Sequence, residues 1–327
     1  MRKLKDLIWT FFRMITLLIG VSVLSFVLVT SSPIDPLTAY IGTESTISEE
    51  AKAEIAEHWG LNDPPVQRFC TWAKNTVQGD LGTSIAYKKP VINVIGERFK
   101  YSLSLMITAW ILSGVLGFLL GMITGIYKGS IFDKVIKVFC IGLQSAPTFW
   151  IGLLVISFFS IYLGWFPIGF AAPIGKAAQD ITIWDRLYHI VLPALTLSVL
   201  SLGKITLYTR QKVIEILGSD FILMAKARGE TTFQIIRRHV VRNISLPAIT
   251  EQFSSFSELF GGMALAETVF SYPGLGSATT AAGVKGDVPL LLGIAIFSAI
   301  FVFVGNMIAN ILYNVLDPRV REEAIHD

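Results

Sequence analysis

Long runs of residues without a charged side chain constrain the fold of this chain more than any other feature. The longest runs cover residues 101–127, 138–175 and 288–316. A bilayer core about 30 Å thick is crossed by a helix of about 20 apolar residues, and helices are required because lipid offers no partners to backbone polar groups. Charged residues make up 16% of the chain, whereas soluble domains carry about a quarter. The sequence therefore predicts an all-α polytopic membrane protein.

Six membrane spans account for the apolar pattern. Five of them follow apolar runs, in chain order residues 14–30, 101–127, 138–165, 187–209 and 288–316. The remaining span, Ile249–Phe270, is less obvious because it carries Glu251, Glu258 and Glu267. Charges are costly at membrane depth, so these acids are functional candidates. Lys204 interrupts the fourth span, and we expect it to extend its ammonium group to the interface.

The distribution of basic residues orients the spans. Residues 204–250 carry eight Lys or Arg against three acids, and residues 128–137 carry three Lys against one Asp. Residues 31–100, between the first two spans, carry seven basic against nine acidic residues. Since cytoplasmic loops are enriched in Lys and Arg, six spans place every basic loop and both termini in the cytoplasm. The first span is expected to be an uncleaved membrane helix.

Residues 35–100 are expected to form a small extracytoplasmic segment. A helix beginning near Ser48, a second helix over Val66–Val77 and a turn at residues 79–82 are indicated by capping, amphipathic and glycine signals. Two interpretations remain open: a lid packed on the spans, and a docking surface for an extracytoplasmic partner.

A basic insert over residues 224–247 stands out from the apolar body. Thr231 and Thr232 are positioned to cap a short helix, with Phe233, Ile235 and Ile236 on one face and Arg237 and Arg238 on another. Pro247 is expected to end this helix and begin the next span. The residues alone leave three interpretations: a helix on the membrane surface, a solvated loop, or a helix held for the groove of another protein.

The insert also carries a recognisable motif. MAKARG, with Leu246-Pro247 ending eighteen residues after the glycine, resembles the E-A-A-x-x-x-G loop motif of ABC importer permeases. Ala225, Gly229 and Ile244 match that motif together with Leu246 and Pro247. Leu223 and Met224 replace its leading Glu and Ala, so the acidic end of the motif is missing here.

Other stretches resemble the dipeptide, oligopeptide and nickel branch of type I ABC importer permeases, which are binding-protein-dependent transport system inner membrane components. These stretches are RRHVVRNISLP (237–247), ETVFSYPGLG (267–276), LDPRVR (316–321), DLGTS (80–84) and PVINVIGER (90–98). The resemblance covers essentially the whole chain. It implies a type I importer permease fold with six spans, divided into residues 1–100 (first span and extracytoplasmic cap), 101–317 (permease core) and 318–327 (cytoplasmic tail).

The resemblance implies that the insert is a coupling helix, over roughly Glu230–His239, seated in a cleft of a cytoplasmic ATPase. The residues expected to couple the permease to the ATPase are Ala225, Gly229, Glu230, Thr231, Thr232, Phe233, Ile236, Arg237, Arg238, Leu246 and Pro247. Gly229 is expected to permit the sharp turn into this helix. The residues expected to form the translocation path or gate are Glu258, Glu267, Phe270 and Pro273. Glu258 is expected either to line the path or to pair structurally, and both interpretations remain open.

The expected partners follow from what the chain lacks. No G-x-x-x-x-G-K-[ST] phosphate-binding loop occurs, so we expect no bound cofactor and no enzymatic activity, with ATP and Mg on partner subunits. The implied partners are a second homologous permease, ATPase subunits, an extracytoplasmic solute-binding protein and membrane lipid, but no nucleic acid. The expected location is the inner or plasma membrane of a prokaryote.

The substrate is less constrained than the class of protein. Peptides are the expected cargo, and nickel or a metal chelate is the alternative. An ion-coupled secondary transporter is a less favoured alternative, because it would require paired, repeat-related broken helices. Glycines 117, 121 and 125 recur every four residues, which suits close helix packing either inside the chain or against a second permease.

Overall fold

The computed structural model describes residues 2–31, 48, 50 and 63–316, and nearly all of them are helical. The chain divides into two compact units, which are described separately: residues 1–102 with 273–303, and residues 103–272 with 304–327. Within the described residues, four helices are long and apolar enough to cross a membrane, and a bent helix pair raises this number to five if the pair counts as one span. The four helices are α1 (Arg2–Thr30), α5 (Val91–Ile126), α8 (Ile183–Leu217) and α14 (Val288–Leu316).

The first unit joins the ends of several helices through a small apolar core. Its further elements are α4 (Pro65–Val77), β1 (Thr83–Ser84), β2 (Lys89–Pro90) and α13 (Leu275–Val284), and β1 and β2 form an antiparallel hairpin. Val91, Ile95, Leu275 and Leu290 are buried in this core. Helix α5 begins at Val91, ten residues before the uncharged run at 101, because amphipathic residues extend the helix beyond its purely apolar part.

Asp287 ties the hairpin to the start of α14. Its Oδ2 accepts hydrogen bonds from Ser84 Oγ at 2.6 Å and from the Ala86 amide at 2.8 Å, while its Oδ1 accepts from the Leu290 amide at 3.1 Å. The side chain is completely buried. A buried carboxylate is stable only when its oxygens are hydrogen-bonded, so this residue fixes where the hairpin sits on the helix end.

The segment between the first two spans is partly described. The helix expected near Ser48 lies outside the described residues, whereas the helix expected over Val66–Val77 is confirmed as α4. The expected turn is also present, with Gly79 at φ +89° and Gly82 at φ +81°. Phe69 and Trp72 of α4 pack against a buried cluster formed by Phe26, Val288 and Leu292. This packing supports the lid interpretation of the described part.

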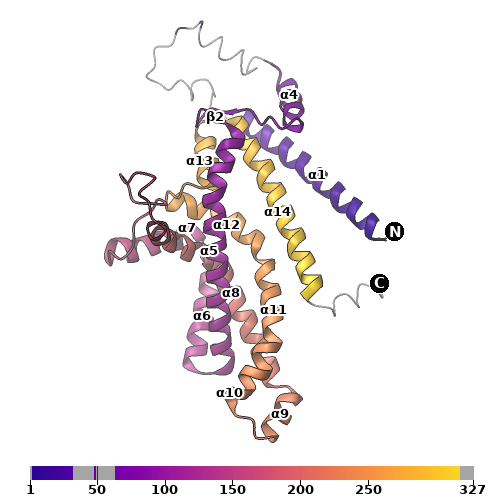
Figure 1. Cartoon of the computed structure of the whole chain (residues 1–327), viewed down its shortest axis with the longest axis vertical. Helices are drawn as coiled ribbons and strands as arrows, with labels where there is room; N and C mark the ends of the chain where they lie inside the picture. The colour runs from indigo at the N-terminus through magenta and orange to yellow at the C-terminus, as the bar shows by residue number, and fades with distance from the viewer. Residues whose placement is uncertain (1, 32–47, 49, 51–62, 317–327) are drawn as a thin grey trace. The chain divides into compact units, whose positions relative to one another are not determined.

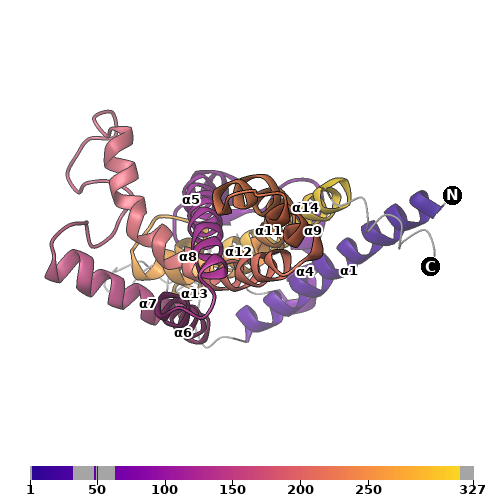
Figure 2. The ribbon, with the colours of Figure 1, turned by 90° about the horizontal axis from the view of Figure 1, so that it is seen from below.

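The second unit is organised around α8, which begins with a capping box between Thr182 and Asp185. The elements that accompany it are α6 (Ile131–Ser145), α7 (Thr148–Val155), the π-helix η1 (Ile156–Tyr162), α9 (Asp220–Ala227), α10 (Thr232–Ile235), the π-helix η2 (Ile236–Val240), α11 (Val241–Ser254) and α12 (Phe256–Val269). Helices α6, α7, α11 and α12 all contact α8. Figure 2 shows α8, α11 and α12 side by side.

Glycines of α5 allow a close approach to α8. A Cβ atom on Gly121 would lie 2.6 Å from Thr209 Cβ and 2.7 Å from the Thr206 carbonyl oxygen, and one on Gly125 would lie 2.6 Å from Val213 Cβ. These distances are shorter than carbon atoms tolerate, so only glycine fits. The glycine stripe therefore packs inside the chain, which resolves the alternative left open by the sequence.

The expectation of one straight span from about Val138 to Trp165 is wrong. Helix α6 ends at Ser145, and α7 with η1 continues at 116° to it. Ala146 has φ −89° and ψ 137°, the extended conformation that a following proline favours. Pro147 therefore breaks the apolar run into two helices.

The segment expected to be the fifth span, Ile249–Phe270, forms parts of two consecutive helices. Helix α11 ends at Ser254 and α12 begins at Phe256, with Ser255 in a turn between them. This segment does not reach the length and apolarity of the four helices named above. Its three glutamates and the break at Ser255 explain its weak apolar signal.

Replacing Gly121 with alanine is expected to destabilise the protein by about 1–3 kcal/mol, because the added methyl group overpacks the contact between α5 and α8. Thermal unfolding of the detergent-solubilised protein measures this effect. Gly142→Ala in α6 is the matched control, since no atom lies within 4 Å of its Cβ position. Equal unfolding temperatures for the two variants would contradict the packing described here.

Candidate functional site

Residues 218–240 form a projecting segment, here called the arm, between α8 and α11. The chain leaves α8 at Leu217, forms α9, turns at Gly229 and continues through α10 and η2 directly into α11. Figure 1 shows α9 and α10 together at one end of the second unit, beyond the ends of α8 and α11. The arm contains most of the residues that the sequence assigned to coupling.

Gly229 makes the turn that separates α9 from α10. Its φ of +83° lies in the left-handed region, which glycine adopts without the steric cost that a Cβ imposes. The Gly229 amide donates to the Lys226 carbonyl at 2.9 Å, and the Glu230 amide donates to the Ala225 carbonyl at 3.2 Å. The expected sharp turn into the second helix of the arm is confirmed.

A capping box starts that second helix. Thr231 Oγ1 accepts from the Gln234 amide at 3.4 Å, and Gln234 Oε1 accepts from the Thr231 amide at 2.8 Å. Reciprocal bonds of this kind satisfy amides that a helix start otherwise leaves unpaired. The expected cap at Thr231 is confirmed, and Thr232 is the first residue of α10.

Pro247 does not end this helix as expected. It lies inside α11, which follows η2 without a break. Proline lacks the amide that would donate to the carbonyl four residues earlier, but Ile244 and Ala248 on either side are buried. Helix α11 therefore continues through Leu246 and Pro247, which are half-buried within it rather than at its start.

Apolar residues on one side of the arm anchor it to the ends of α5 and α8. Ile222 and Ala225 of α9 and Ile235 of α10 are buried in one cluster with Met122 and Val213. Ile236 packs against the edge of the same cluster. Ala225 and Ile236, both assigned to coupling from the sequence, therefore hold the arm in place.

Three large apolar side chains of the arm are exposed. Leu223, Met224 and Phe233 are 67%, 69% and 70% exposed, and Arg237 and Arg238 are exposed beyond them. Several exposed large apolar side chains on a short protruding segment indicate a site that another molecule covers. We call Leu223, Met224 and Phe233 the apolar face of the arm. The sequence did not assign Leu223 and Met224 to coupling, since they depart from the motif at these positions.

Glu230 contacts two other charged or titratable side chains within the arm. Its Oε2 lies 3.0 Å from His239 Nε2, and its Oε1 lies 3.5 Å from Arg228 Nη2. The Phe221 ring contacts the His239 ring, with centroids 6.3 Å apart. These contacts connect the turn before α10 to the last turn of η2. Glu230 is therefore placed to keep the shape of the arm rather than to extend from it.

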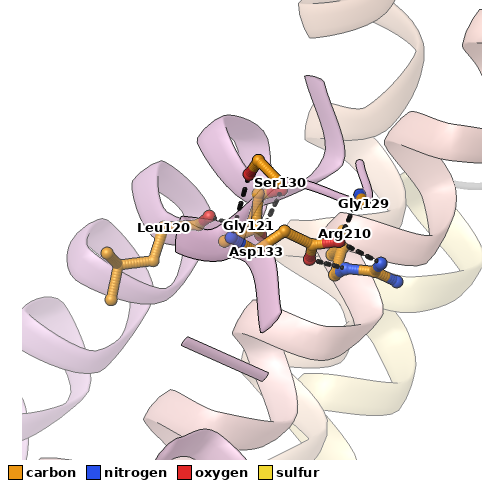
Figure 3. A network of polar contacts seen from close by, with 7 residues as sticks. Leu120, Gly121, Gly129, Ser130, Asp133 and Arg210 are labelled. Atoms are coloured by element: carbon orange, nitrogen blue, oxygen red, sulfur yellow. Dashed lines mark hydrogen bonds and ion pairs between the residues drawn. The ribbon is translucent and has the colours of Figure 1, made fainter. Parts of the chain in front are cut away.

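An ion pair at the arm's end of α8 was missed by the sequence analysis. Arg210 Nε lies 2.5 Å from Asp133 Oδ1, and Arg210 Nη2 lies 2.8 Å from Asp133 Oδ2. The Gly129 amide donates to Asp133 Oδ2 at 2.8 Å, and Ser130 Oγ accepts from the Asp133 amide at 3.1 Å. Figure 3 shows the carboxylate between the Gly129 turn and the guanidinium. The signal was present, because Asp133 is the one acid in a basic loop and stands three residues after a serine cap.

An ion pair with two parallel hydrogen bonds fixes the relative orientation of its two side chains in addition to pairing their charges. The Asp133 side chain is only 4% exposed. The pair links the first turn of α6 to Arg210, which lies seven residues before the end of α8. Movement of this part of α8 is therefore expected to move α6 as well.

Lys204 has two acidic partners on later helices. Its Nζ lies 3.2 Å from Glu251 Oε1 and 3.6 Å from Glu258 Oε1. Glu251 lies on α11 and Glu258 on α12, so one ammonium group on α8 faces carboxylates on both sides of the Ser255 turn. Glu258 thus has a charged partner and is also half-exposed.

The remaining residues assigned to the path or gate lie near the end of α12. Glu267 and Phe270 are buried, and the Phe270 carbonyl accepts from the Phe170 amide at 2.8 Å. Ser271 has φ +48°, where the chain turns sharply. Pro273 is half-buried and belongs to the first unit. The gate assignment of these residues stays a prediction. No group of three His, Cys, Asp or Glu side chains with metal-site geometry occurs among the described residues.

Comparison with known proteins identifies the protein family of this chain. Residues 117–322 match the family model of the binding-protein-dependent transport system inner membrane component. The chain belongs to this family. It is 35% identical to the oligopeptide transport system permease protein AppB of Bacillus subtilis (strain 168), over 94% of this chain and 96% of that protein.

Two further relatives span nearly the full length. The chain is 30% identical to the di/tripeptide transport system permease protein DppB of Pseudomonas aeruginosa (strain UCBPP-PA14), over 98% of each chain. It is 31% identical to the dipeptide transport system permease protein DppB of Escherichia coli (strain K12), over 93% of this chain and 95% of that protein. The family resemblance stated from the motifs is confirmed.

A solved structure supports the fold. The inward-facing MetNI methionine ABC transporter aligns with a TM-score of 0.50 at 16% identity, covering 69% of this chain and 97% of that chain. The fold is therefore that of a type I importer permease, as the resemblance implied.

Replacing Asp133 with alanine is expected to destabilise the protein by about 1–3 kcal/mol, because a mostly buried guanidinium loses its partner. Thermal unfolding in detergent measures the change. Lys212→Ala on the same helix is the control, since its pair with Glu215 is solvent-exposed and such pairs contribute about 0–1 kcal/mol. If Asp133→Ala unfolds at the same temperature as Lys212→Ala, the fastening role of the Asp133–Arg210 pair is wrong.

Proposed function

We propose that this chain is a membrane-spanning subunit of an ATP-driven importer for dipeptides and oligopeptides, and that it forms the translocation path together with a second permease. The three relatives described above are named as peptide permeases and match nearly the whole chain. Their names support peptides as cargo over nickel or a metal chelate. Family membership likewise favours an importer permease over an ion-coupled secondary transporter.

In this proposal the arm docks in a cleft of a cytoplasmic ATPase. The observation that carries the assignment is the combination of a buried anchor and an open apolar face on one short segment. Ile222, Ala225 and Ile235 fix the arm to the unit, while Phe233 and its neighbours remain exposed. An anchored helix with protruding apolar side chains suits insertion into a groove of another protein. ATP and Mg then belong to that partner, and this chain performs no hydrolysis itself.

The connections of the arm suggest how a closing movement of the ATPase would be transmitted to the membrane-spanning helices. The arm is continuous with α8 at one end and with α11 at the other, so a force on it acts on both helices. The Asp133–Arg210 pair extends the force from α8 to α6. Because packed interfaces switch between discrete arrangements rather than deform continuously, a displaced arm is expected to move α6, α8 and α11 together.

The remaining partners and the orientation follow from the same proposal. The basic residues of the arm and of residues 128–137 support a cytoplasmic location for these segments and for both termini. An extracytoplasmic solute-binding protein would deliver the cargo on the opposite side, and lipid would surround the assembly. The chain would then lie in the inner or plasma membrane of a prokaryote. The division into residues 1–100, 101–317 and 318–327 remains part of this proposal.

Phe233→Ala is expected to weaken binding of the ATPase to the permease about 30-fold, because truncation of a central aromatic anchor typically costs about 2 kcal/mol. Titration of the purified ATPase onto detergent-solubilised permease complex measures the affinity. Ile174→Ala is the control, since Ile174 is 81% exposed but lies in the segment between η1 and α8, far along the chain from the arm. An unchanged affinity in Phe233→Ala would remove the arm from the ATPase interface.

The complete importer, reconstituted into proteoliposomes with its second permease, ATPases and binding protein, is expected to take up a labelled tripeptide only when ATP is present with the ATPases. Uptake is expected to continue after a protonophore has collapsed the proton gradient. Uptake abolished by the protonophore while ATP remains available would contradict the proposal and favour an ion-coupled carrier.

A further inference from the structure

Three charged residues meet where α8 passes the break between α11 and α12. Lys204 lies in the middle third of α8, a helix long and apolar enough to cross the membrane. Its ammonium group is 3.2 Å from Glu251 and 3.6 Å from Glu258. We call Lys204, Glu251 and Glu258 the charged triad. Charged side chains within membrane helices are rare because they are expensive, and they usually face an aqueous cavity or a protein partner.

The triad carries more negative than positive charge. With all three groups ionised, two carboxylates oppose one ammonium, so one negative charge is left over. Glu251 is the nearer acid and is 20% exposed, whereas Glu258 is the more distant acid and is 51% exposed. The geometry thus assigns Glu251 as the main partner of Lys204. The carboxylate of Glu258 remains accessible to a further cation.

The surface around Glu258 is partly polar and open. Ser254, four residues earlier, is exposed, and Ser257 Oγ donates to Asn306 Oδ1 at 2.6 Å. Gly261, three residues after Glu258 and on the same helix face, has no atom within 4 Å of its Cβ position. Leu265, seven residues after Glu258, is 48% exposed on the same side of the helix, so this face of α12 is mixed in character. A carboxylate at membrane depth requires water or a polar partner, which favours an aqueous path at Glu258.

From these observations we propose that Glu258 is a substrate-binding residue of the translocation path, where its carboxylate accepts hydrogen bonds from ammonium groups of a peptide cargo. Lys204 is a positioning residue, since its ammonium group lies 3.6 Å from this carboxylate, and Glu251 is the nearer partner of Lys204. This inference rests on the proposed peptide-import function. An ammonium group has three donors and a full charge, so its bonds to a carboxylate are about twice as strong as bonds between neutral groups.

The site would make transport sensitive to the charge of the cargo. A passing peptide with a lysine side chain presents a second ammonium group to Glu258, whereas one with a glutamate side chain brings a like charge toward the surplus carboxylate. In a water-poor site such differences are larger than in bulk water. The chain therefore contributes a charge preference that is separate from the selection made when a binding protein captures the peptide.

The test uses the complete reconstituted importer and the tripeptides Ala-Lys-Ala, Ala-Gln-Ala and Ala-Glu-Ala, each saturating the binding protein. Uptake by each variant is divided by uptake by the unaltered importer for the same peptide, which cancels the preference of the binding protein. Glu258→Gln is expected to lower Ala-Lys-Ala uptake about tenfold, as for the loss of a hydrogen bond to a charged group. Uptake of Ala-Glu-Ala is expected to change by about twofold or less, because the substitution also removes the repulsion between Glu258 and the glutamate side chain of that peptide.

Matched variants separate binding from folding. Glu258→Asp keeps the charge and is expected to preserve the ranking of the three peptides. Glu251→Gln removes the nearer partner of Lys204, so Lys204 pairs more closely with Glu258, and uptake of Ala-Lys-Ala is expected to fall relative to the other two peptides, but by less than in Glu258→Gln. Size-exclusion chromatography of each complex confirms that it is assembled.

The possible failures are distinguishable. If the unaltered importer takes up peptides but Glu258→Gln changes all three rates equally, or none of them, this inference is overturned and the proposed function stands. If the unaltered importer shows no ATP-dependent uptake of any tripeptide, the proposed function and this inference fall together.

Discussion

The second unit depends on the close contact between α5 and α8. Backbone atoms and short side chains of α8 occupy the space that side chains at Gly121 and Gly125 would need. This contact fixes the ends of both helices beside each other, and those ends supply Met122 and Val213 to the cluster that anchors the arm. Without the glycine contact, the arm would lack the surface on which Ile222, Ala225 and Ile235 are buried.

The sequence was most informative where the signal was local. Uncharged runs located four long helices, the Gly229 turn and the Thr231 cap followed from single residues, and ordered motifs gave the family. It failed where neighbours along the chain compete. Pro147 broke an apolar run that looked like one helix, whereas Pro247 lies inside a continuous helix with Ile244 and Ala248 buried beside it. The same residue type thus had opposite outcomes, and only packing decides between them.

The functional residues were less predictable than the fold, because their roles depend on partners far away in the sequence. Glu230 and Ile236 belong to the motif region, yet they stabilise the arm from within instead of forming its open face. Arg210 and Asp133 are 77 positions apart, and Lys204 is paired with acids on two later helices. No periodicity in a single segment reports such pairings. A lone charge in an apolar run therefore marks a site worth attention without identifying its partner.

The π-helical turn η2 gives the arm a property that an ordinary helix would lack. A π-turn accommodates one more residue than an α-turn, so it holds an insertion in the register between the arm and α11. Moving that insertion along the helix by local rearrangement would rotate the intervening side chains by about 100°, the angular step of one residue in an α-helix. Arg237 and Arg238 lie within η2. A shift of this kind would therefore reorient the Arg237 and Arg238 side chains relative to α11.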